Sequence, residues 1–78
     1  PQEGKEYRGK IKRIHFEVGF IESDLDQDLA FHKSRVNPQH EFENLKQDKD
    51  VMFKVYFEKG KPSLDKHGNY KASEVRLK

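Results

Sequence analysis

Hydrophobic and polar residues alternate over several short stretches of the chain, at the two-residue period that places every second side chain on one face of a β-strand. The clearest stretch covers 51–58, where Val51, Phe53, Val55 and Phe57 fall on the same face. Similar stretches rich in β-branched and aromatic residues predict strands over 7–15, 18–22, 29–32 and 70–77. The pattern therefore predicts five short strands.

Turn-forming residues separate these stretches. An acidic segment over 23–28 ends the second strand, and Pro38 interrupts the chain after the third because proline cannot donate to a β-ladder. Residues 39–50 have room for one helical turn, but Asp48-Lys49-Asp50 favours a tight turn instead. The glycines, proline and asparagine of 60–69 predict a long loop.

Five strands in 78 residues would leave exposed edges in an open sheet. Closure into a barrel removes those edges. We therefore predict one all-β domain over 1–78, a small five-stranded antiparallel barrel of the OB type, with 1–5 as a flexible start. An SH3-like barrel is the main alternative on pattern alone.

The alternation also predicts an outward face. If Leu29 and Phe31 point inward, Ala30 and His32 point outward, and an inward Ile21 sends Val18, Phe20 and Glu22 outward. Ile11 and Ile14 can both point inward only if the first strand carries a bulge near Lys12-Arg13. The predicted face carries Lys10, Lys12, Arg13, Phe20 and His32. Met52 and Tyr56, on the outer side of the fourth strand, are interpreted as packing at the barrel rim.

Several segments in register resemble a cold-shock domain: Gly9-Lys10-Ile11-Lys12, Gly19-Phe20-Ile21, 28–34, 42–53 and 68–75. This family has an OB-type barrel that binds single-stranded RNA or DNA through its first three strands. The resemblance adds Val18, Lys33 and Phe42 to the predicted nucleic-acid-binding residues. Arg13, Val18 and Ala30 stand where the family has aromatic residues, and in this the chain resembles divergent modules of multi-domain eukaryotic translation regulators.

Such a face suits a single strand, since Phe, His and Arg can stack on bases while cations meet phosphates. The net charge of +2 adds little, although five cations and one acid lie between Lys5 and Arg13. The alternative function is a protein-interaction or spacer module that keeps the barrel and has lost the nucleic-acid face.

Other classes of function find little support in the sequence. The four histidines fall on different predicted elements without metal-ligand spacing, and the acidic segment lacks the glycine and glutamate of a calcium loop. The chain has no cysteine and no apolar stretch near 20 residues. We therefore expect a cytoplasmic, non-enzymatic, monomeric domain with no cofactor and no membrane contact, whose partners are single-stranded RNA or DNA and neighbouring domains or proteins.

Overall fold

β1 (Glu6–His15) is the strand around which the sheet curls. In the computed structural model, which describes residues 1–78, its first half pairs with β4 (Asp50–Val55) and its second half with β2 (Val18–Ser23). Gly9 belongs to both pairings, and a Cβ at this position would lie only 2.5 Å from Cγ2 of Ile21. The absence of a side chain there lets the two halves of the sheet approach closely.

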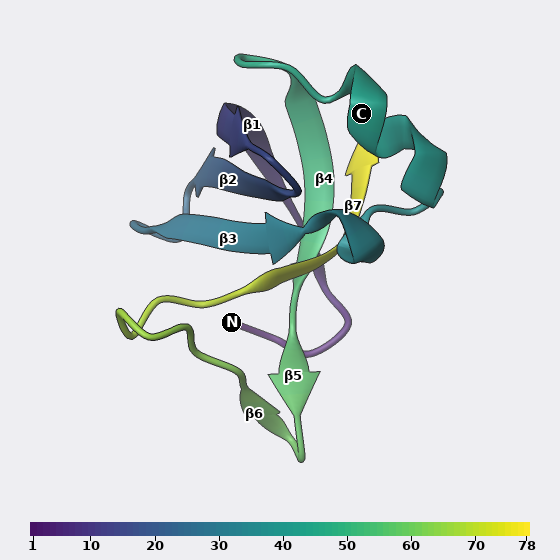
Figure 1. The fold of residues 1–78 in the computed structure, drawn as a ribbon. Coiled ribbons are helices and arrows are strands. Elements are labelled where there is room, and N and C mark those ends of the chain that lie inside the picture. The colour runs from purple at the N-terminus through teal and green to yellow at the C-terminus, as the bar shows by residue number, and fades with distance from the viewer.

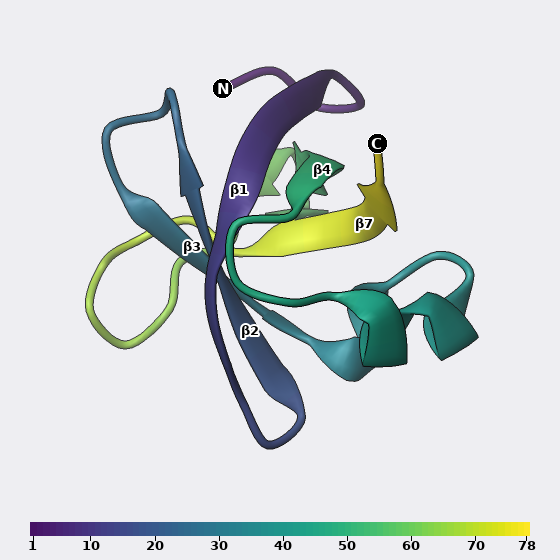
Figure 2. The ribbon, with the colours of Figure 1, turned by 90° about the horizontal axis from the view of Figure 1, so that it is seen from above.

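The sheet has five antiparallel strands in the order β3-β2-β1-β4-β7, with β3 at Asp28–His32 and β7 at Ala72–Leu77 (Figure 1). Parallel bridges from Ala30 to Lys71 and from Val36 to Val75 bring its two edge strands together. Figure 2 shows the resulting curl from above. A three-stranded meander whose third strand meets the last strand in parallel is the OB arrangement, so the predicted all-β barrel is confirmed.

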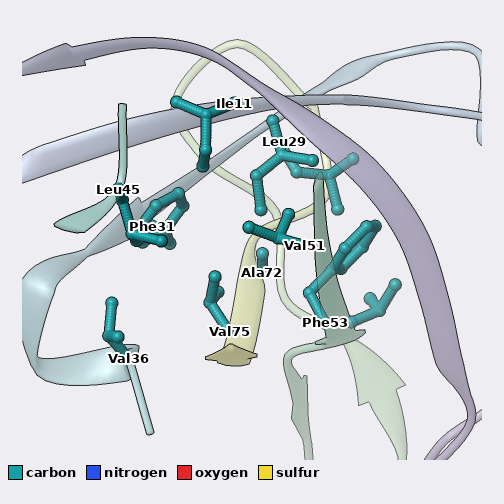
Figure 3. Close-up of a cluster of buried hydrophobic side chains, with 11 residues drawn as sticks. Ile11, Leu29, Phe31, Val36, Leu45, Val51, Phe53, Ala72 and Val75 are labelled. Carbon is teal, nitrogen blue, oxygen red and sulfur yellow. The ribbon is translucent and has the colours of Figure 1, made fainter. Parts of the chain in front are cut away.

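The inward side chains form one core of eleven buried apolar residues: Ile11, Ile21, Leu29, Phe31, Val36, Leu45, Val51, Phe53, Val55, Ala72 and Val75. Figure 3 shows most of them converging from opposite walls of the barrel. Of the inward positions expected in the second, third and fourth strands, all but Phe57 are in this set, and Phe57 is partly buried against the core. The predicted register of these strands is therefore confirmed as far as Val55. The predicted bulge is also present, as a register shift between Ile11 and Arg13.

The predicted fourth strand and the loop after it differ from the structure. β4 ends at Val55, and Phe57–Glu58 (β5) pairs with Lys61–Pro62 (β6) in a small hairpin that extends from the barrel (Figure 1). Lys59 and Gly60 form its turn with φ of 51° and 78°, and two successive positive φ values are typical of a tight hairpin. The predicted loop over 60–69 therefore begins inside a hairpin.

The segment between β3 and β4 also contains more secondary structure than predicted. It holds two short 3₁₀ helices, η1 (Lys33–Arg35) and η2 (Gln39–Asn44), before Asp48 turns the chain with φ of 71°. The segment contains both a helical turn and a tight turn, so the preference for the tight turn alone was wrong. No helix is long and apolar enough to cross a lipid bilayer.

Candidate nucleic-acid interface

The outer surface of β1, β2 and β3 is organised in three rows that run across the strands. The register places Arg13, Phe20 and Ala30 in the central row. His15, Val18 and His32 form the row at one end, and Lys10, Glu22 and Asp28 the row at the other. The sequence prediction of this face is therefore consistent with the register, and the rows show which residues are neighbours.

The bulge in β1 determines what the central row contains. It inserts Lys12 as an extra residue, so that Arg13 faces outward opposite Phe20 and Ile14 turns back toward the core. The Arg13 guanidinium carbon lies 4.5 Å from the centroid of the Phe20 ring. The two side chains form a cation–π pair, an arrangement that presents both a flat surface and a positive charge.

His32 is held in place by polar contacts at the edge of its ring. Its Nδ1 accepts a hydrogen bond from the backbone N–H of Ser34 at 3.1 Å, and its Nε2 lies 3.6 Å from a carboxylate oxygen of Glu17. The side chain is exposed. These contacts use the ring edge, so they leave the ring faces for stacking.

The row that contains Lys10 is less positive than the sequence predicts. Nζ of Lys12 lies 2.7 Å from Oδ2 of Asp28 in an ion pair. Lys10 is exposed and takes part in no ion pair, but Glu22 is its cross-strand neighbour. Of the two lysines, Lys10 is therefore the one available to a phosphate.

Lys33 and Phe42 lie apart from the central row. Nζ of Lys33 forms an ion pair with Glu17 at 2.6 Å, and this contact lowers the pKa of the Glu17 carboxyl. Phe42, on η2, is half-buried and meets the ring of Phe31 edge-on at 6.4 Å between centroids. Phe42 thus packs on the core, and Lys33 is already paired with the Glu17 carboxylate.

A hollow of about 320 Å³ opens beside Ala30. Val18, His32, Arg35, Tyr56, Asp65 and Lys71 are among the residues that line it. The chain after β6 runs alongside β3, as both ribbon views show (Figures 1 and 2). The hollow lies between these two segments. The small side chain of Ala30 leaves this space open.

Tyr56 and Arg35 are functional candidates that the sequence analysis missed. The guanidinium carbon of Arg35 lies 4.2 Å from the centroid of the Tyr56 ring, so the hollow holds a second cation–π pair. The alternation of the fourth stretch assigns Tyr56 to packing at the barrel rim, and no sequence pattern points to Arg35. The sequence signal that was present is the outward parity of Tyr56 on the fourth stretch, but nothing local indicates that η1 lies beside it.

Phe16 is a further aromatic residue of this surface that no sequence pattern indicates. It occupies the turn between β1 and β2 with φ of 55° and is 86% exposed. Its ring meets His15 edge-on at 4.6 Å. An apolar ring this exposed at the end of the interface is an additional surface on which a base could stack.

Comparison of the chain with protein-family models finds no match, and comparison with curated proteins finds none either.

Proposed function

We propose that this domain is a non-enzymatic module that binds single-stranded nucleic acid, RNA in the first place, through the outer face of β1–β3. The observation that carries the proposal is the central row. Phe20 stands outward on the middle strand beside the Arg13 guanidinium, 4.5 Å away. A base can stack on such a pair while the cation meets a neighbouring phosphate.

The charges around this row support the same proposal. Lys10, Arg13, Arg35 and Lys71 take part in none of the ion pairs of the chain. Cations without acidic partners can neutralise phosphates at no cost in broken ion pairs. The resemblance to cold-shock domains agrees with this function, and it suggests one cytoplasmic module within a larger polypeptide.

We expect a modest affinity because the face carries few aromatic rings on which a base can stack. Each stacked base contributes roughly 1–3 kcal/mol. Phe20 in the central row, His32 in the end row and Tyr56 in the adjoining hollow are the ring systems available. We expect dissociation constants in the micromolar range or weaker for the isolated domain, with tighter binding when further modules act on the same strand.

An NMR titration with pools of short single-stranded RNA and DNA tests the proposal. The expected result is that the amides of Phe20, Ala30 and His32 shift, more strongly with RNA than with DNA. Shifts confined to the loops, or no shifts at millimolar oligonucleotide, would favour the alternative of a protein-interaction or spacer module.

A further inference from the structure

The hollow beside Ala30 combines a stacking surface with a carboxylate. Tyr56 and Arg35 form one part of its lining, and Asp65 and Lys71 contribute from the chain after β6. At about 320 Å³ it is near the lower end of the range for small-molecule sites, roughly 300–1,000 Å³. Its size and its flat π surfaces suit a single nucleobase.

Asp65 is placed in the hollow by its own turn. Its Oδ1 accepts hydrogen bonds from the backbone N–H groups of His67 at 2.8 Å and Asn69 at 3.0 Å. These bonds, that from Asn69 above all, lower the pKa of the Asp65 carboxyl, so it is ionised at neutral pH. Its second oxygen, Oδ2, accepts no hydrogen bond within the chain. The turn therefore holds the carboxylate in position and leaves one acceptor unused.

An anionic acceptor repels phosphate but accepts hydrogen bonds from amino groups of bases. Cytosine and adenine carry an exocyclic amino group at the position where uracil and thymine present a carbonyl oxygen, and guanine carries its amino group on another part of its edge. Arg35 and Lys71, in the same lining, are cations outside any ion pair and suit the phosphates on either side of the base. The carboxylate of the hollow thus suits the amino group of a base, and the two cations suit the flanking phosphates.

We infer that this hollow is a base-selective subsite that accepts one amino-bearing base of a single strand, stacked against Tyr56 and Arg35, and discriminates against uracil through Oδ2 of Asp65. The inference rests on the proposed function, because it assigns the base preference of that same face.

Asp65→Asn is a sharp test because the asparagine keeps Oδ1 as the acceptor for His67 and Asn69 while it replaces the unused acceptor by an N–H donor. Fluorescence anisotropy with labelled oligo(rC) and oligo(rU) of equal length measures the preference. We expect the wild type to bind oligo(rC) about fivefold more tightly or better. Asp65→Asn should abolish or reverse this preference, because uracil O4 accepts from the new donor.

Two further variants complete the test. Asp48→Asn makes the same charge change at an exposed turn with φ of 71°, a conformation that asparagine tolerates, and it should keep the preference for oligo(rC). Ala30→Leu should fill the hollow with a side chain that cannot stack and weaken the binding of both oligonucleotides severalfold, in a domain that melts like the wild type.

The outcomes separate the inference from the proposed function. Equal binding of oligo(rC) and oligo(rU) by the wild type, a preference that survives in Asp65→Asn, or undiminished binding by Ala30→Leu would overturn the inference and leave nucleic-acid binding standing. If neither oligonucleotide binds the wild type, both the proposed function and the inference fail.

Discussion

Phe20 and Phe31 lie on neighbouring strands, yet their side chains lie on opposite sides of the barrel wall. Phe31 is 3% exposed, and its ring lies against Gly19, where a Cβ would be 2.3 Å from it. Phe20, opposite Ala30, points outward and is half-buried beside Arg13. One residue of register separates a core position from a candidate binding position.

Truncation of the two rings should therefore have opposite effects. Phe31→Ala removes a buried ring and should lower the free energy of unfolding by roughly 3–5 kcal/mol. Phe20→Ala should lower it far less and weaken oligonucleotide binding by roughly 1–3 kcal/mol, the contribution of one stacked base. Thermal melting and anisotropy titration of both variants measure these effects.

The opposite result would be informative in a different way. If Phe20→Ala melts far below the wild type while Phe31→Ala is harmless, the face described here is not the outer one. If Phe20→Ala changes neither property, the central row loses its role in binding.

Residue orientation is the level at which the sequence predicted most. Alternation in β2, β3 and β4 is strict, so one inward residue determines its neighbours, and Ile11 with Ile14 required the bulge at Lys12. The charge partners were not predictable in this way. Asp28 reaches Lys12 from another strand, sixteen residues away, and alternation says nothing about where such long side chains end.

At the scale of elements, the bulge in β1 is coupled to the start of β3 through the Lys12–Asp28 ion pair at 2.7 Å. Asp28→Asn should free Lys12 and remove a negative charge from the face. We expect tighter oligonucleotide binding and a salt dependence that is steeper by about 0.7, the value of one added phosphate contact on a single strand. Anisotropy titrations over a range of salt concentrations measure both effects.

Glu22→Gln is the matched control for this prediction. Glu22 lies in the same row as Asp28 but takes part in no ion pair, so its neutralisation removes the same charge without freeing a lysine. A steeper salt dependence in Asp28→Asn than in Glu22→Gln is expected. Equal slopes would mean that Lys12 does not reach phosphate even when it is free.

The turn held by Asp65 should respond to acid. Because the pKa of its carboxyl in the folded protein lies below the ordinary value of 3.8, the stabilisation of the turn is present above that value and is lost as the pH falls through the folded pKa. The amide shifts of His67 and Asn69 should titrate together with a midpoint below 3.8 and should not titrate in this way in Asp65→Asn. A midpoint above 3.8 in the wild type would contradict the hydrogen bonds described here.

The hollow is the part of the site that the sequence could not give. Its lining comes from β2, β3, η1, the link between β4 and β5, the chain after β6 and the start of β7. These segments are spread from Val18 to Ala72 and meet only because the sheet closes. Local patterns predict which side of a strand a residue occupies. They do not predict that Arg35 covers Tyr56 or that a loop aligns with β3.

At the scale of the whole molecule, the balance of charge on the face predicts a moderate dependence of binding on salt. Four cations of the face, Lys10, Arg13, Arg35 and Lys71, lie outside ion pairs. If three of them meet phosphates, log affinity should fall against log salt with a slope of about −2. A flat dependence, measured by the same titration, would remove these residues from the interface.

The junction between β3 and β7 is the least hydrogen-bonded line of the barrel. It consists of the two parallel bridges and the bond from the N–H of Asn37 to the carbonyl of Val75 at 2.8 Å. Amides at this junction should exchange with solvent faster than those shared by β1, β2 and β4. Hydrogen exchange measured by NMR checks this, and slower exchange at Asn37 than in the centre of β1 would contradict it.

The hollow spans this same junction, with Ala30 and His32 on one side and Lys71 and Ala72 on the other. A nucleic-acid strand bound there would contact both edges of the sheet. Binding would therefore stabilise the closed barrel. Thermodynamic linkage makes the effect measurable: a ligand at 100 times its dissociation constant adds about 2.7 kcal/mol to the free energy of unfolding. The rise in melting temperature with different oligonucleotides would then rank their sequences by affinity for the domain.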